Sequence, residues 1–441
     1  MTSSSAEIRA PFDRTLAQCT SAIRERNGEL VALVRVLDTP LSDPDAAPDA
    51  PLAGVGYVLK DTWDTAGVHT TGGSWRHRDR IPDAHSAVFA AFQRAGAVLL
   101  GKSNLCDLAF SVESDNHIVG KTSNPFDLTR TSGGSTGGGA AAVGAGMANF
   151  DWGSDFGGSI RMPAAFCGVT GLRLSASTWP IPSDFFPRTP ELDLELHGMG
   201  PLARRVAGCR AVMRAVREDL AMPGPRARAK DTEARVVVYG PDEKTMGEWP
   251  TFVGEACAAL LRAKVPFDID RTIPAPRVVD EAYDGYLASN FAAFLGTGEL
   301  PIKDGLAAVA LALASRGRLD QRVHPHTAYL LAMLAAGSVT LYRKAGPVRG
   351  RVDKVRDAVA SVWEKDRFIV APSTTFPAPR HGRAMKMRGM LAFAKLGNLT
   401  DATSIAIPFG RYPGGMPRSL QILGPAGSEE ALLDLAERLE A

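Results

Sequence analysis

The sequence predicts an α/β protein, and its length, its composition and its pattern of apolar residues support this class. The chain has 441 residues, of which 45% are hydrophobic and 22% charged, which excludes intrinsic disorder as the main state. From Leu52 onward, short apolar runs alternate with stretches of helical spacing. Because one core rarely exceeds about 250 to 300 residues, we expect two domains or one large elaborated domain.

Local patterns predict the elements along the chain. Residues 8–37 have helical spacing and residues 39–51 are rich in Pro, Asp and Ala, which predicts an N-terminal helical arm and a linker. A second linker is expected at 223–230. Short apolar runs predict strands at 55–59, 97–100, 235–240 and 368–371, and periodic segments predict helices at 86–94, 251–264 and 428–440.

Charge and cysteine content narrow the class of function. A formal net charge of +2 provides no general field to attract nucleic acid or an anionic membrane, so we expect a small-molecule substrate. The five cysteines are scattered and lack a C-x-x-C pair, and residues 1–10 lack a long apolar core, which favours a cytoplasmic protein. Residues 131–150 carry no charge, but seven of these twenty residues are glycine, so we reject a membrane span.

Two blocks rich in serine and glycine, residues 133–139 and 153–161, are the strongest candidates for chemistry. In each block a serine, Ser135 or Ser159, follows a pair of glycines. Glycine lets the backbone turn sharply and present N–H groups to a ligand, which is how an oxyanion hole is built. The uncharged run at 140–148 beside the first block is typical of a buried segment rather than a surface loop.

A serine nucleophile needs a base to accept its proton. The eight histidines lie outside both blocks and form no H-E-x-x-H pattern, and His324-Pro-His326 is typical of a loop, so neither a metal nor another cofactor is expected. Lys60 ends an apolar run, and burial there would lower the pKa of a lysine toward neutrality and make its amine a base. From its position alone, however, an ion pair with Asp61 is the favoured interpretation.

Five ordered blocks resemble the amidase signature family. They are Leu59-Lys60-Asp61, Gly101-Lys-Ser-Asn-Leu105, Asn124-Pro-Phe-Asp127, Gly133-Gly-Ser135-Thr-Gly137 and Gly157-Gly-Ser159-Ile-Arg161-Met-Pro163-Ala-Ala-Phe-Cys-Gly168. Ser135 and Ser159 are 24 residues apart, as in the family pattern. The resemblance is dense from Leu52 to about Arg210 and weaker toward the C-terminus.

The resemblance implies a single large domain with a mixed central β-sheet and helices on both faces. It divides the chain into the arm and linker at 1–51 and an amidase signature domain at 52–441. Within that domain it implies a catalytic core at about 52–212, a variable substrate-lining region at about 223–390, and a return to the core at about 391–441.

The resemblance also implies a proton relay. Ser159 is similar to the family nucleophile, Ser135 to the bridging serine that follows a cis peptide bond after Gly134, and Lys60 to the terminal base. Neutral Lys60 would take the proton of Ser135, which would take that of Ser159. Ser159 would then attack an amide carbonyl to form an acyl-enzyme, and water would release the acid after ammonia or an amine has left.

The second block is implied to provide the oxyanion hole and its support. The implied donors are the backbone N–H groups of Phe156, Gly157, Gly158 and Ser159. The family commonly has Thr-Asp-Thr where this chain has Ser154-Asp155-Phe156, so Ser154 keeps a hydroxyl near the site while the bulkier Phe156 would narrow the acyl site or pack in the core. Arg161 could contact an acidic substrate, but a buried guanidinium usually needs a partner, which favours an ion pair with Asp155.

Three functions are compatible with these motifs. The first is a stand-alone amidase that acts on linear amides as a free chain or homodimer, and it is the one we expect. The second is the glutamine-amidase-like subunit of a tRNA transamidation complex, which is disfavoured because that subunit commonly has glutamine where Met162 stands. The third is a serine esterase with Ser135 as nucleophile. It is disfavoured because residues 127–132 do not form a β-rich run and because Lys60 and Ser159 would have no role.

Overall fold

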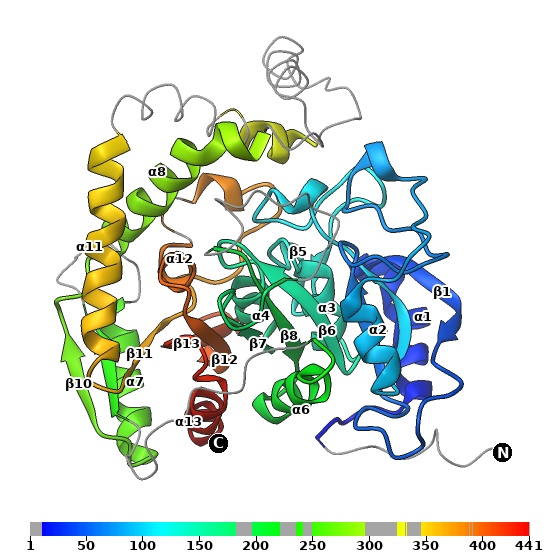
Figure 1. Cartoon of the computed structure of the whole chain (residues 1–441), viewed down its shortest axis with the longest axis horizontal. Helices are drawn as coiled ribbons and strands as arrows, with labels where there is room; N and C mark the ends of the chain where they lie inside the picture. Colours follow the sequence, from blue (N-terminus) through cyan, green and yellow to red (C-terminus); the bar gives the residue numbers. More distant parts are fainter. Residues whose placement is uncertain are drawn as a thin grey trace.

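The computed structural model describes residues 11–181, 196–220, 235–240, 249–295, 324–330, 332, 345–387, 389 and 391–440. Within this part of the chain, one mixed sheet of 11 strands forms the centre of the molecule (Figure 1). Its strand order is β1-β3-β2-β6-β8-β7-β12-β13-β11-β9-β10. Strands β2, β3 and β6 are parallel to one another, as are β9, β10 and β11, and the remaining neighbours are antiparallel.

The strands of the central sheet, in chain order, are β1 Leu33–Leu41, β2 Gly56–Lys60, β3 Val98–Ser103, β6 Phe150–Asp155, β7 Thr170–Arg173, β8 Gly198–Ala203, β9 Arg235–Tyr239, β10 Phe267–Asp270, β11 Arg367–Pro372, β12 Thr403–Arg411 and β13 Pro417–Gly424. A separate hairpin pairs β4 Ser123–Asn124 with β5 Asp127–Thr131. The described α-helices are α1 Leu16–Leu30, α2 Ala87–Arg94, α3 Gly137–Gly144, α4 Arg161–Cys167, α6 Val206–Val216, α7 Trp249–Arg262, α8 Pro276–Leu295, α11 Ala345–Trp363, α12 Ala392–Leu399 and α13 Glu429–Glu440.

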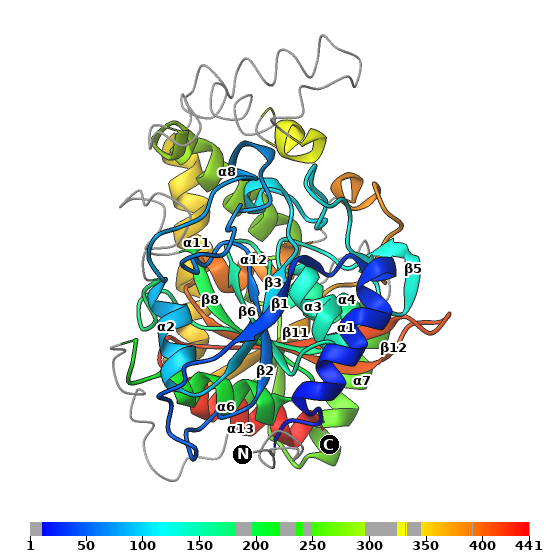
Figure 2. The same ribbon diagram turned by 90° about the vertical axis from the view of Figure 1, so that its right-hand side faces the viewer.

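Helices cover both faces of the sheet, because alternate residues of the buried strands are apolar on each face. On one face Tyr57 and Leu59 of β2 pack in a cluster with α2, α6, α7 and α13. On the other face Val58 packs with α1, α3 and α4, while the strands nearer β10 pack against α8, α11 and α12. Figure 2 shows α6 and α13 together on one side of the sheet. The expected α/β fold with a mixed sheet and helices on both faces is confirmed.

The helix expected over 8–37 is wrong in part. Helix α1 begins after Thr15, whose hydroxyl accepts the backbone N–H of Gln18 while the Gln18 side chain accepts the Thr15 N–H. It ends at Leu30, and Leu33–Leu41 forms edge strand β1, which pairs antiparallel with β3. The first half of this segment, residues 33–37, holds apolar residues that include two valines, and such a run suits a strand as well as it continues the helical spacing. The predicted arm thus supplies a strand to the central sheet.

The other expected elements that fall on described residues are confirmed to within two or three residues at each end. They correspond to strands β2, β3, β9 and β11 and to helices α2, α7 and α13. The second expected linker, 223–230, lies outside the described residues. Strand β5 occupies the segment that we expected not to be β-rich, although it belongs to the hairpin and not to the central sheet.

The parallel strands β2, β3 and β6 bring the predicted site together. They end at Lys60, Ser103 and Asp155, and the carboxyl ends of parallel strands meet at the same edge of a sheet. Helices α3 and α4, which begin within the last residues of the two serine-glycine blocks, pack on the same region. The fold therefore places the predicted base and both serine loops at one end of three strands.

Candidate active site

Lys60 lies in a buried compartment lined by hydroxyl groups. All residues of β2 are buried, and the Lys60 side chain is 0% exposed. Its Nζ lies 2.7 Å from Oγ of Ser135, 3.0 Å from Oγ1 of Thr136 and 3.0 Å from Oγ of Ser154, with the Ser154 carbonyl at 3.4 Å. The predicted base and the predicted bridging serine are therefore in direct contact.

Ser135 is held by its backbone. The peptide bond between Gly134 and Ser135 is cis, as the family resemblance implies. The Ser114 hydroxyl donates to the Ser135 carbonyl at 3.2 Å, and the Ser114 N–H donates to the Gly133 carbonyl at 2.9 Å. A Cβ atom on Gly134 would lie 2.9 Å from the backbone nitrogen of Glu113, so only glycine fits there. These contacts fix the loop that presents the Ser135 hydroxyl to Lys60.

Ser159 lies in the loop between β6 and α4, beside the Ser135 loop. The Thr136 N–H donates to the Ser159 carbonyl at 3.1 Å, which ties the two loops together. Among the described residues, the Ser159 hydroxyl makes no hydrogen bond, and the residue is partly exposed. An accessible hydroxyl without an internal partner is available to a substrate.

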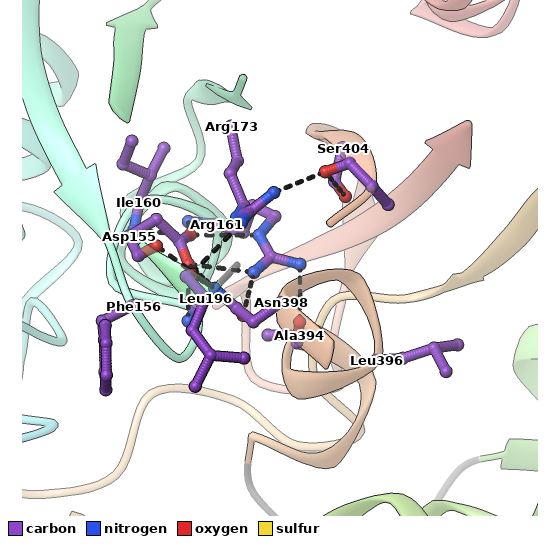
Figure 3. A network of polar contacts seen from close by, with 12 residues as sticks. Asp155, Phe156, Ile160, Arg161, Arg173, Leu196, Ala394, Leu396, Asn398 and Ser404 are labelled. Atoms are coloured by element: carbon purple, nitrogen blue, oxygen red, sulfur yellow. Dashed lines mark hydrogen bonds and ion pairs between the residues drawn. The ribbon is translucent and has the colours of Figure 1, made fainter. Parts of the chain in front are cut away.

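Asp155 and Arg161 form a buried ion pair beneath the Ser159 loop (Figure 3). Both side chains are 0% exposed, and the Arg161 Nε and one terminal nitrogen donate to the two carboxylate oxygens at 3.0 and 2.9 Å. Burial alone would raise the pKa of Asp155, but the Arg161 charge and hydrogen bonds outweigh it and hold that pKa well below its usual range. The expected pairing of these two residues is present.

The Arg161 guanidinium has no donor left for a substrate. Its five N–H groups find five acceptors at 2.6 to 3.0 Å. Figure 3 shows Asp155, Asn398 and Ala394 around the guanidinium, and the fifth acceptor is Oε1 of Gln421. Contact with an acidic substrate is therefore not its role. The residue joins the Ser159 loop to α12 and β13 instead.

The Gly158 N–H is not available as an oxyanion donor. It donates to Oδ1 of Asp155 at 2.7 Å, while the Ile160 N–H donates to Oδ2 at 3.1 Å. Gly158 has φ +112°, and a Cβ there would lie 2.6 Å from the Ala394 Cβ, so glycine is required for the turn. We therefore do not assign Gly158 as an oxyanion donor, because its N–H group already donates to the Asp155 carboxylate.

The other three predicted donors differ from Gly158. The N–H groups of Phe156, Gly157 and Ser159 make no hydrogen bond to the described residues. Tyr283 of α8 donates its hydroxyl to the Phe156 carbonyl at 2.7 Å. Since C=O and N–H point in opposite directions across a trans peptide, this bond directs the Gly157 N–H away from Tyr283. The Phe156 ring is partly buried and meets the His197 ring edge to face.

Four residues in contact with this site were not predicted from the sequence. Thr136 stands next to Ser135 within the recognised block, so its position was visible although its contact with Lys60 was not. Tyr283, Asn398 and Gln421 come from α8, α12 and β13, and they are separated by 127 to 260 residues from the loop residues that they bind. No local motif marks them.

The position of Asp61 next to Lys60 suggested an ion pair between them, but Asp61 pairs with Lys102 instead. Its carboxylate lies 3.3 Å from Nζ of Lys102 and accepts both the N–H and the hydroxyl of Thr71. Burial raises the pKa of Asp61 and lowers that of Lys102. Lys60 and Lys102 project from opposite faces of the sheet, and Asp61, which follows the last residue of β2, contacts Lys102.

No metal centre is found among the described residues, where no group of three His, Cys, Asp or Glu side chains is arranged to hold an ion. His324 contacts its neighbours His326 and His117 through their rings and lies 3.6 Å from Asp115. In the same part of the chain, every helix is too short or too polar to cross a bilayer.

Comparison with known proteins identifies the family. The amidase family model matches residues 23–433. The chain belongs to the amidase signature family. It is 30% identical over 417 residues to a glutamyl-tRNA(Gln) amidotransferase subunit from Synechococcus sp. (strain RCC307), with 88% of this chain and 84% of that protein covered.

A second relative by sequence is similar over most of its length, and a solved structure shares the fold. The putative amidase AmiB2 of Mycobacterium tuberculosis (strain ATCC 25618 / H37Rv) is 28% identical over 425 residues, with 90% of this chain and 83% of that protein covered. The solved structure of 6-aminohexanoate cyclic dimer hydrolase superposes with a TM-score of 0.73 at 22% identity and covers 96% of this chain and 92% of that one. This amidase signature protein is therefore a hydrolase of the amidohydrolase type.

Proposed function

We propose that the chain hydrolyses a linear carboxylic amide through an acyl-enzyme on Ser159, with Ser135 and Lys60 as its proton relay. Neutral Lys60 takes the proton of Ser135, and Ser135 takes that of Ser159 as its oxygen bonds to the amide carbonyl carbon. The reverse transfer protonates the leaving nitrogen, and ammonia or an amine departs. Water then attacks the ester, the bond to Ser159 breaks, and the carboxylic acid is released.

The observation that carries this proposal is the 2.7 Å contact between Nζ of Lys60 and Oγ of Ser135 in a fully buried compartment. Burial disfavours an ammonium ion, and hydroxyl and carbonyl oxygens of Ser135, Thr136 and Ser154 lie within 3.4 Å of the amine. The unoccupied N–H groups of Phe156, Gly157 and Ser159 are available for the oxyanion, which is worth about 3 kcal/mol for one donor.

A panel of primary amides of aliphatic, aryl and peptidic type tests the reaction. The purified chain should release ammonia from at least one class, and Ser159→Ala should abolish release. Since Ser159 is partly exposed and its hydroxyl makes no hydrogen bond within the described residues, the variant should keep the circular dichroism spectrum and the melting temperature of the parent. Turnover by Ser159→Ala at the parent rate would refute the proposed nucleophile.

Membership of a tRNA transamidation complex is the second candidate, because the similarity to the glutamyl-tRNA(Gln) amidotransferase protein extends over 88% of the chain. We favour the stand-alone enzyme, as a free chain or homodimer. The free cysteines, four of them buried, support a reducing, cytoplasmic location for either candidate. Size-exclusion chromatography with the ammonia assay separates the two, because a component of a transamidation complex would show activity only after a second protein is added.

An esterase that uses Ser135 as nucleophile is less well supported. The strand before Ser135, β5, belongs to the two-stranded hairpin, whereas a nucleophile elbow needs a strand of the central sheet. Peptide mapping after reaction with a fluorophosphonate distinguishes the two serines. The amidase relay predicts a label on Ser159, and a label on Ser135 with Ser159 untouched would favour the esterase.

A further inference from the structure

A second buried ionisable group, Asp151, lies on the same face of the sheet as Lys60. In the parallel pairing of β2 with β6, Asp151 stands opposite Val58, two residues before Lys60. Residues two apart on a strand share a face, so Asp151 and Lys60 both project toward α3. Asp151 is 0% exposed. The relay described above gives this carboxyl no role.

The contacts of Asp151 lead to the Lys60 compartment. Ser103 of β3 stands directly opposite Lys60 in the sheet register, and its hydroxyl donates to Oδ1 of Asp151 at 2.8 Å. Oδ2 has no hydrogen-bond partner among the described residues. Gly139 of α3 makes room for that oxygen, since a Cβ atom there would lie 2.2 Å from Oδ2. The carboxyl is therefore built into the packing of α3 on the sheet, with one oxygen left unsatisfied.

The carboxyl and the lysine influence each other's charge. Burial raises the pKa of Asp151 to about 7, although the hydrogen bond from Ser103 and the charge of Lys60 both lower it. Coupling between two titrating groups is reciprocal, so ionised Asp151 favours protonated Lys60 to the same extent. The protonation state of Lys60 thus depends on Asp151, which titrates near neutral pH.

We propose that Asp151 is a positioning residue that sets the pH at which Lys60 becomes an active base. This inference rests on the proposed relay. While Asp151 is ionised, it stabilises the ammonium form of Lys60, so the relay needs a higher pH to start. During attack, the same carboxylate stabilises the positive charge that Lys60 acquires when it accepts the proton of Ser135.

The other charged groups near this compartment have separate partners. Asp61, which directly follows β2, pairs with Lys102 of β3, and Lys102 projects from the face of the sheet opposite to Lys60. On the Lys60 side, burial raises the pKa of the Cys106 thiol to about 12, against the charge of Lys60, which lowers it, so Cys106 is neutral in the working range. Helix α3, from Gly137 to Gly144, contains only glycine, alanine and valine and adds no titratable group.

The test compares the pH dependence of fluorophosphonate labelling at Ser159 in the parent and in Asp151→Asn, read by mass spectrometry of the labelled peptide. This readout does not need the natural substrate. The asparagine keeps the shape and the acceptor for Ser103 but removes the charge. We expect the acidic limb of the rate profile to move to lower pH by about one unit, and the rate on that limb to rise by up to about tenfold.

Two further variants complete the experiment. Ser103→Ala removes the hydrogen bond that favours the ionised carboxyl, so it should move the limb in the same direction by a smaller amount. It tests the same coupling if Asp151→Asn does not fold. The control is Asp107→Asn, which changes a buried carboxyl that accepts the His324 N–H at 2.8 Å, and it should leave the limb in place.

The possible results separate the two proposals. An unchanged limb in a folded Asp151→Asn protein, a move to higher pH, or an equal move in Asp107→Asn would overturn the role of Asp151. A parent protein that is labelled at Ser135 or not labelled at all would refute the proposed relay instead, before any variant is compared.

Discussion

Lys60 and Lys102 are both fully buried at the ends of neighbouring parallel strands, yet their surroundings differ. Lys60 stands opposite Ser103 in the register of β2 and β3, and Lys102 stands opposite Leu59, so the two side chains project from opposite faces of the sheet. Lys102 meets the carboxylate of Asp61 and the Thr70 hydroxyl, whereas Lys60 meets the hydroxyls of the serine loops. Burial alone therefore does not make a lysine a base, because the groups that contact its amine decide whether it stays charged.

The largest expected effect separates the two lysines by activity. Lys60→Met keeps most of the buried hydrocarbon but removes the amine, and we expect amide hydrolysis to fall by about 10⁴-fold or more, as when a relay residue of a serine hydrolase is removed. The melting temperature should change little. Steady-state rates and thermal unfolding on the same preparation measure both. A Lys60→Met protein that retains a tenth of the parent rate would contradict the assignment of Lys60, and not Lys102, as the base.

Lys102→Met should act on stability instead. It leaves the Asp61 carboxylate buried without its cation, which costs about 3 to 5 kcal/mol in the free energy of unfolding. Urea unfolding measures the loss. The double variant Lys102→Met with Asp61→Asn removes the stranded charge and should recover most of that energy. Equal stability of Lys102→Met and the parent would show that the pair does not hold this face of the sheet.

Asp151 gives a pH dependence of stability with a defined sign. Its folded-state pKa of about 7 lies above the ordinary value of 3.8, so the folded state holds this proton longer than the unfolded state. The contribution of the Asp151 carboxyl to the free energy of unfolding is therefore present at about pH 4, and it is lost as the pH rises to about 7. Relative to the parent, Asp151→Asn should gain about 4 kcal/mol in the free energy of unfolding between about pH 4 and pH 8. Parallel pH profiles of unfolding for the two proteins would contradict this.

The smallest expected effect concerns a hydroxyl that acts on the oxyanion loop rather than on a lysine. Tyr283→Phe removes the hydrogen bond to the Phe156 carbonyl, and we expect kcat to fall about tenfold, equivalent to about 1.4 kcal/mol, with little change in KM. Tyr239→Phe, whose hydroxyl donates to the Pro274 carbonyl, is the matched control. A fall in kcat of the same size in both variants would assign the effect to general destabilisation.

The sequence predicts those parts of the fold and site that depend on local patterns. Short buried strands such as β2 and β9 and the serine-glycine loops could be located because their apolar runs and glycines are contiguous. Strand β1 could not, because its apolar residues continue a helical pattern and its pairing with β3 joins residues that are 58 to 70 positions apart. The strand order of the sheet depends on such long-range pairing throughout.

The partners of individual side chains were harder to predict than the side chains themselves. Position alone favoured an ion pair between Lys60 and Asp61, but Asp61, just beyond the end of β2, pairs with Lys102 of the neighbouring strand. The Gly158 N–H was expected to face the oxyanion, and the carboxylate of Asp155 takes it. In both cases the sequence shows which groups are present but not which way they point.

The most direct test of the proposed relay is the rate at which a fluorophosphonate labels Ser159, measured across pH in the parent and in Lys60→Met. We predict that the parent rate rises with pH as the amine loses its proton, and that the variant is labelled at least about 10³-fold more slowly, with no such rise. Equal rates and equal pH profiles in the two proteins would contradict the assignment of Lys60 as the base.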